Sequence, residues 1–325
     1  MHTLLENSGQ IHAKLKELFS TNTRDQKRVI VVAYVGAAAP TLLPDAAGIT
    51  IYCNPQPEST NAYALSKLIG QGANVHFVKG LHMKLYWVKG AGAIVTSANL
   101  STNALGHSGL HEYGVFLHNA EEVDIDRVVA GLDARPCDES MLKQMQREHD
   151  IFWSNRNGDD QEAPKSPDFA EWYNSIARRE WKIGGYLEGI DVAASVEARV
   201  KREYDVSEPN HAISCTEKTY QRGDWILQYD RSGKGGKLTN FEWMFVQFVE
   251  RVSSKDKAYM KAEPYQAVEA TRSSHLCEPF HANKAFERAF KKAVDKYGPA
   301  KLHDREKMTV PPSLIEHIAE FYKQG

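Results

Sequence analysis

Four polar side chains stand at regular spacing in the segment HMKLYWVKGAGAIVTSANLS, residues 82–101. His82 and Lys84 are two residues apart, and so are Ser97 and Asn99. Residues two apart on a strand point to the same face, so we expect the members of each pair to project together. An imidazole can act as a nucleophile, while ammonium, amide and hydroxyl groups can hold the oxygens of an anion. The spacing therefore predicts that four polar side chains converge on one surface, which an ordinary buried hairpin would not show.

Apolar runs around this segment predict the elements that position it. Alternating or β-branched runs indicate strands over 28–34, 49–54, 75–78, 82–88, 93–99 and 112–117. A helix is expected over 59–70, between the second and third of these strands, and a short amphipathic helix over 1–19. This order of elements predicts an α/β domain with a mixed sheet flanked by helices.

The polar residues together resemble the signature of the phospholipase D superfamily, H-x-K-x4-D-x6-G-S-x-N. His82, Lys84, Ser97 and Asn99 occupy the matching positions with unbroken spacing. Glu112 falls where many members of that superfamily carry a glutamate on the following strand. The resemblance implies a phospholipase D-like fold over residues 1–153.

Two positions differ from the superfamily signature. Lys89 stands where the signature has Asp, and Thr96 stands where it has Gly. A sequence without this Asp is most similar to the single-motif nuclease or restriction-endonuclease-like branch, in which HxK and GSANLT are followed by a glutamate. A side chain at position 96 is expected to narrow the space for a phosphate.

The resemblance also implies how the site would work. The protein would be a metal-independent phosphodiesterase without a cofactor, most similar to a DNA endonuclease. His82 would attack phosphorus and form a phosphohistidine, while Lys84, Ser97 and Asn99 would bind the phosphate. Glu112 would orient His82 or Asn99. DNA is favoured over RNA as the substrate.

This chemistry needs two histidines, because one attacks phosphorus and the other protonates the leaving group. A second candidate, HANK at 281–284, has its His and Lys three apart and no SxN after them, which indicates the start of a basic helix. A single motif per chain therefore implies a homodimer, in which the His82 side chains of two subunits meet across a two-fold axis.

The second half of the sequence predicts a separate C-terminal α+β domain over 169–325, whose role the sequence leaves open. Residues 154–168 hold two prolines and a glycine without apolar periodicity and are interpreted as a linker. Aromatic residues in the strands expected around 225–230 and 241–252 are interpreted as core.

A basic helix is expected over 281–297. Its apolar stripe runs through Phe286, Phe290 and Val294. Its other face carries the basic residues that could contact nucleic-acid phosphates, although such faces are often simply solvated: Lys284, Arg288, Lys291 and Lys292.

Composition narrows the remaining possibilities. The chain has 325 residues, 42% of them hydrophobic, and a formal net charge of −2, so nucleic-acid binding would need a local basic patch. Its four cysteines form no CxxC pair, and no apolar run is long enough to span a membrane, so a cytoplasmic protein is expected. Two alternatives stay open, namely a non-catalytic nucleic-acid-binding or assembly module with this fold and a phospholipid phosphodiesterase.

Overall fold

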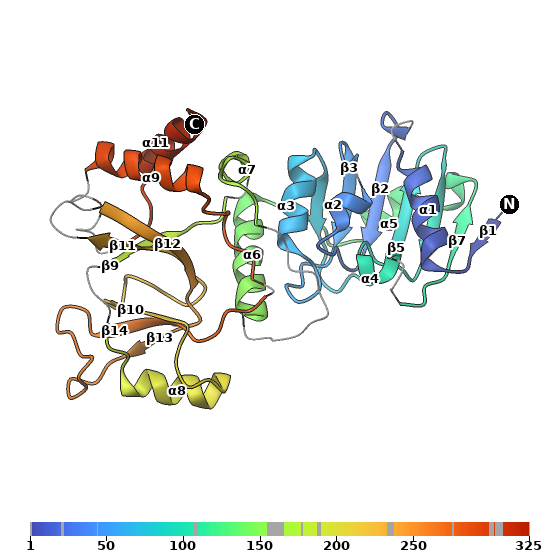
Figure 1. Ribbon diagram of the computed structural model, residues 1–325. Coiled ribbons are helices and arrows are strands. Elements are labelled where there is room, and N and C mark those ends of the chain that lie inside the picture. The colour runs from blue at the N-terminus through green and yellow to red at the C-terminus, as the bar shows by residue number, and fades with distance from the viewer. Residues whose placement is uncertain are drawn as a thin grey trace. The chain divides into compact units, whose positions relative to one another are not determined.

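The protein forms two compact units, each described separately below (Figure 1). The computed structural model describes residues 2–20, 23–43, 45–106, 110–154, 166–176, 178–186, 190–232, 237–274, 276–298, 302 and 308–324. Unit 1 comprises Met1–His149 and Ser175–Ala177, and unit 2 comprises Asp150–Asn174 and Arg178–Gly325. Of the expected linker at 154–168, residues 155–165 lie outside the described part of the chain.

Unit 1 is built on an eight-stranded mixed sheet with the strand order β1-β7-β6-β5-β2-β3-β4-β8. β2 pairs in parallel with β3, which pairs in parallel with β4, and every other neighbouring pair is antiparallel. The predicted mixed sheet is therefore confirmed. Its strands are β1 (His2–Leu5), β2 (Arg28–Val32), β3 (Ile49–Cys53), β4 (Asn74–Phe77), β5 (Lys84–Val88), β6 (Gly92–Thr96), β7 (Gly114–Leu117) and β8 (Arg135–Pro136).

Helices cover both faces of this sheet, as predicted. One face packs against α1, α2, α3, α4 and the first part of α6 through residues such as Ile11, Leu65 and Met145. The other face packs against η2 and α5 through Ala120 and Ile125. The helices are α1 (Ser8–Leu18), α2 (Ala39–Leu42), α3 (Ala62–Gly70), α4 (Thr102–Leu105), η2 (Ala120–Glu122), α5 (Ile125–Ala130) and α6 (Glu139–Trp153).

The N-terminal segment differs from the single helix expected over 1–19. Its first residues form β1, which pairs antiparallel with β7, and α1 begins only after them. The side chain of Asn7 accepts a hydrogen bond from the backbone N–H of Gln10 at 3.0 Å and so caps the helix. The pairing of β1 with β7 and the Asn7 cap together determine where α1 begins.

Unit 2 is an α+β unit with two three-stranded sheets, ordered β10-β14-β13 and β12-β11-β9. The predicted aromatic core is confirmed, because Trp225, Trp243 and Phe245 pack beneath α9 and α11 with almost no exposed surface. Its elements are α7 (Phe169–Asn174), β9 (Lys182–Tyr186), α8 (Ala194–Tyr204), β10 (His211–Cys215), β11 (Trp225–Ser232), β12 (Lys237–Phe245), β13 (Phe248–Arg251), β14 (Tyr265–Glu269), α9 (Lys284–Tyr297) and α11 (Pro312–Lys323).

Candidate active site

The candidate residues gather at one edge of the sheet in unit 1. β5 runs antiparallel to both β2 and β6, and β6 runs antiparallel to β7. The starts of β5 and β7 therefore meet the ends of β2 and β6 at the same edge. The sequence placed the polar residues within long strands, but only Lys84 belongs to one. Four of the predicted site residues lie just beyond strand ends, namely His82, Ser97, Asn99 and Glu112.

His82 and Lys84 are in direct contact at the start of β5. The ammonium Nζ of Lys84 donates to the carbonyl oxygen of His82 at 2.9 Å. The same Nζ lies 3.2 Å from Nε2 and 3.3 Å from Nδ1 of His82. These near-equal distances mean that the ammonium is not aimed at one ring nitrogen. The His82 side chain is exposed, so a substrate can reach its imidazole.

Ser97 and Glu112 form the second part of the site. The hydroxyl of Ser97 donates to the carboxylate of Glu112 and accepts from the backbone N–H of Tyr113 at 3.1 Å. The backbone N–H of Ser97 donates to the carbonyl of Tyr113 at 3.0 Å, which extends the pairing of β6 with β7. Glu112 is 7% exposed. Within the described residues its side-chain hydrogen bond is to Ser97, and the expected contact with His82 or Asn99 is not formed in this single chain.

Asn99 faces the end of β2. Its side-chain oxygen accepts a hydrogen bond from the backbone N–H of Tyr34 at 3.1 Å. The Nδ2 group is thus left as the donor that can reach a ligand. Neither Asn99 nor Ser97 is the N-cap of α4. Ser101 has that role, because its side-chain oxygen accepts a hydrogen bond from the backbone N–H of Ala104 at 3.3 Å.

Two charges act on each other across the site. Partial burial lowers the pKa of Lys84, and the negative charge of Glu112 acts in the opposite direction. Burial raises the pKa of the neighbouring Tyr86, whose hydroxyl donates to the carbonyl of Ala98 at 3.1 Å. A cation beside an exposed imidazole, with the amide Nδ2 of Asn99 as a donor at the same edge, is an arrangement suited to an anionic substrate.

Lys89 and Thr96, the two residues that differ from the superfamily signature, lie in different surroundings. Lys89 is exposed at the turn between β5 and β6, five residues from Lys84 and so about 17 Å away along the strand. Thr96 donates from its hydroxyl to the carbonyl of Tyr113 at 2.8 Å. A Cβ added at Gly114, its partner on β7, would lie 2.9 Å from the Thr96 Cβ. Gly114 thus provides the space that Thr96 occupies.

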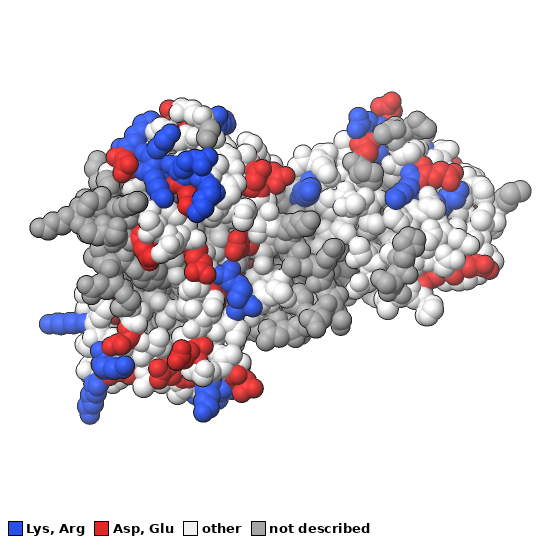
Figure 2. All heavy atoms as spheres, in the orientation of Figure 1, with Lys and Arg blue, Asp and Glu red and all other residues white. Residues whose placement is uncertain are grey.

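The basic residues predicted on the helix after residue 281 lie on α9, in unit 2. Figure 2 shows Lys and Arg side chains gathered over the part of unit 2 that α9 and α11 form. Lys284 is bound to Glu287 at 3.1 Å, and Lys291 lies over the ring of Phe241 at 5.3 Å. Lys292 is exposed. The residues HANK lie at the start of α9, as predicted. The Asn283 side chain accepts a hydrogen bond from the backbone N–H of Phe286 and is the N-cap of the helix.

Several solved structures are similar to part of this chain. It is similar to the phospholipase D family member Nuc from Salmonella typhimurium, at 11% identity and a TM-score of 0.31, over 42% of this chain and 99% of Nuc. It is also similar to NucT from Helicobacter pylori, at 14% identity and a TM-score of 0.33, over 40% of this chain and 92% of NucT.

A third similar structure is the phosphatidylserine synthase of Haemophilus influenzae Rd KW20, at 11% identity and a TM-score of 0.31, over 47% of this chain and 43% of the synthase. No family model matches the sequence, and a search of curated proteins finds no match. Among the helices of the described residues, none has both the length and the apolar character required to cross a bilayer.

Proposed function

We propose that unit 1 is a phosphodiesterase that cleaves DNA through a phosphohistidine, without a metal. The observation that carries this proposal is the contact of Lys84 with an exposed His82 at the sheet edge that also holds Ser97 and Asn99. A nucleophile, a cation and neutral donors for the nonbridging oxygens are what the reaction requires.

The first step of the proposed reaction forms the covalent intermediate. A ring nitrogen of His82 attacks phosphorus, the N–P bond forms, and the bond from phosphorus to the leaving oxygen breaks. Lys84 and the Nδ2 group of Asn99 hold the nonbridging oxygens as their charge increases. Because the single hydroxyl proton of Ser97 is donated to Glu112, Ser97 fixes the loop that carries Asn99. The leaving oxygen takes a proton from a second histidine.

Water completes the cycle. Its oxygen attacks phosphorus, the N–P bond breaks, and the second histidine takes the proton that the water loses. Both histidines then return to their starting protonation states, so the two steps balance.

We propose that the second histidine is His82 of another copy of this chain. The chain has one motif, so a single copy lacks the acid that the first step needs. Large apolar side chains lie exposed beside the site residues: Met83 at 40%, Val95 at 44% and Tyr113 at 52%. Exposed apolar groups of this size next to an incomplete site are typical of a subunit interface. Burial of these three side chains in a homodimer would bring two copies of the edge together.

The first test is cleavage of labelled single-stranded and double-stranded DNA in excess EDTA. We expect the wild-type protein to cut and His82→Ala to lose cleavage. His118→Ala is the matched control, since His118 is exposed at the other end of β7 and should keep full activity. If wild type and His82→Ala bind DNA equally and neither cuts DNA, RNA or phospholipid, the protein is a binding module instead.

We also propose that α9 contacts the DNA backbone through Lys292 and its basic neighbours. Lys292→Gln should weaken binding of all DNA sequences alike and reduce the slope of log affinity against log salt by about 1. Lys255→Gln, an exposed charge elsewhere in unit 2, is the control. Equal slopes for both variants would place the backbone contacts away from α9.

A further inference from the structure

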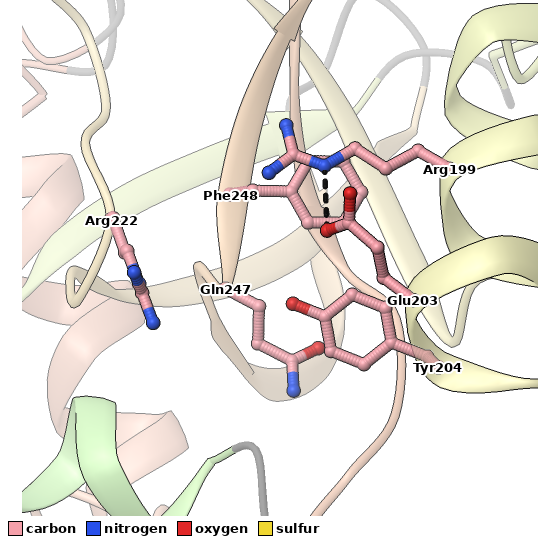
Figure 3. Close-up of a pocket in the computed structure, with 6 residues that line it drawn as sticks. All are labelled: Arg199, Glu203, Tyr204, Arg222, Gln247 and Phe248. Carbon is pink, nitrogen blue, oxygen red and sulfur yellow. Dashed lines mark hydrogen bonds and ion pairs between the residues drawn. The ribbon is translucent and has the colours of Figure 1, made fainter.

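Unit 2 contains a pocket of about 240 Å³ that is distinct from the residues considered so far (Figure 3). Three separate segments line it, namely α8, the loop before β11 and the corner between β12 and β13. The lining residues are Arg199, Glu203, Tyr204, Arg222, Gln247 and Phe248. Its volume is below the about 300–1,000 Å³ of pockets that enclose drug-sized ligands, so it suits a single small ring system.

Arg199 supplies a fixed planar cation in this pocket. Its Nε donates to Glu203 at 3.1 Å and its Nη1 donates to Glu250 at 2.8 Å. The guanidinium carbon lies 4.2 Å from the centre of the buried Phe248 ring. One face of the guanidinium is therefore covered, and its edge is held by two carboxylates. The face turned away from Phe248 remains as a flat surface on which a planar ring can stack.

The polar groups around this flat surface can form hydrogen bonds with the edge of a planar ring. The Tyr204 hydroxyl points away from α8 toward the side of the pocket where Arg222 lies, and burial raises the pKa of Tyr204, so it keeps its proton (Figure 3). Hydrogen bonds from Arg202 and then Arg199 lower the pKa of Glu203, which makes it an ionised acceptor. Gln247 serves as a wall, since its amide is bound to the backbone of Ala270 and Ser154 at 2.6 and 2.8 Å.

We propose that this pocket binds a nucleobase, either in a free nucleotide or as an unstacked base of a nucleic-acid strand. Stacking on arginine and aromatic planes, with hydrogen bonds to the base edge, is how unstacked bases are recognised. The carboxylate of Glu203 would repel a bare phosphate, but it can accept from the N–H groups of a base. Arg222 and Tyr204 supply the complementary donors. Base binding in unit 2 does not depend on catalysis in unit 1.

The test is isothermal titration of the full chain carrying His82→Ala, so that no nucleic acid is cut. The ligands are the four nucleoside 5′-monophosphates, ribose 5-phosphate, a single-stranded DNA oligonucleotide and a matched oligonucleotide of abasic sugars. Tyr204→Phe removes one hydroxyl and keeps the ring packing on Phe248, and Arg222→Gln removes one cation. Lys201→Gln removes an exposed charge from the same helix outside the pocket and is the control.

We expect a nucleotide or the ordinary oligonucleotide to bind more tightly than its base-free counterpart. Tyr204→Phe should weaken that binding about 2- to 10-fold and Arg222→Gln at least about 10-fold, while Lys201→Gln should leave it unchanged. Binding of monophosphates identifies a free nucleotide as the ligand, and binding of the oligonucleotide alone identifies a strand base. Equal binding of the base-free ligands, no binding of any ligand, or no response to Tyr204→Phe and Arg222→Gln would overturn the proposal. Cleavage by the wild-type protein is measured separately, so either proposal can fail without the other.

Discussion

The hydroxyl of Ser97 donates to the carboxylate of Glu112, although the two residues belong to loops at the ends of different strands. The backbone of Tyr113 reinforces this contact by bonding to Ser97 through both its N–H and its carbonyl. Glu112 is nearly buried, and its charge raises the pKa of Lys84 against the effect of burial. The geometry couples the charge of Glu112, just before β7, to the cation of Lys84 at the start of β5, and no ion pair joins these two described residues.

Replacing Glu112 by Gln should move the alkaline limb of the activity profile to lower pH. The proposed reaction requires Lys84 as an ammonium ion, so activity should be lost as pH rises through the pKa of Lys84. Burial lowers that pKa and the charge of Glu112 raises it, so removing the charge lowers it further. The measurement is kcat/KM for DNA cleavage against pH. Glu121→Gln, an exposed acidic residue of η2, should leave the limb in place, and an unmoved limb in Glu112→Gln would contradict the coupling.

Asn99→Asp should separate the structural role of Asn99 from its role in binding phosphate. The substituted side chain keeps an oxygen that can accept from Tyr34 N–H, but it loses the Nδ2 donor and adds a negative charge. We expect kcat to fall about 100-fold or more, as when one donor to a developing oxyanion is removed. Urea unfolding should show little change, whereas Asn99→Ala also loses a bond that contributes about 0.5–1.5 kcal/mol. Full activity in Asn99→Asp would exclude Asn99 from the phosphate site.

Gly114→Ala should destabilise unit 1 by about 1–3 kcal/mol because its new methyl group would meet the side chain of Thr96. Thr96→Gly in the same chain should recover much of that loss, because it removes the atoms in collision. Gly70→Ala is the control, since a Cβ there has no atom within 4 Å. Denaturant unfolding of the two single variants and the double variant gives the comparison. Strictly additive effects would show that Thr96 and Gly114 do not share this space.

Restoring the signature aspartate with Lys89→Asp should leave cleavage unchanged within about twofold. Lys89 is exposed at a turn on the opposite edge of the sheet from His82, so its charge is separated from the site by the length of β5. Surface substitutions of this kind change the free energy of unfolding by about 0.5 kcal/mol or less. A large gain in kcat for Lys89→Asp would show instead that position 89 acts on the reaction.

The sequence predicted the central strands of unit 1 well because their apolar runs are continuous and buried on both faces. Val31 and Ile51, for example, have no exposed surface. The ends of the strands were placed less well, since hydrogen bonds to other segments decide them. Just after β6, the Ser97 hydroxyl accepts a hydrogen bond from the backbone N–H of Tyr113, and nothing near Ser97 in the sequence indicates that partner.

Contacts between distant segments could not be predicted from the sequence either. The pairing of Ser97 with Glu112 depends on the register of β6 with β7, and the acceptance of Thr96 depends on Gly114 across the same pair. Gly114, which lies opposite Thr96, is a sequence signal from which the space for the Thr96 side chain could have been predicted. The pocket of unit 2 brings Arg199 and Arg222 together from segments that share no motif.

The turn that joins β5 to β6 lies a full strand length from His82 and Ser97, so a peptide can be inserted there without contacting the candidate site. Gly90 adopts a φ of 71° there, and its Cβ position has no neighbouring atom within 4 Å. A hydrophilic peptide inserted at this turn would extend from the opposite edge of the sheet and leave the spacing within each site pair unaltered. A recognition loop can therefore be added at this turn while the positions of His82, Lys84, Ser97 and Asn99 stay the same.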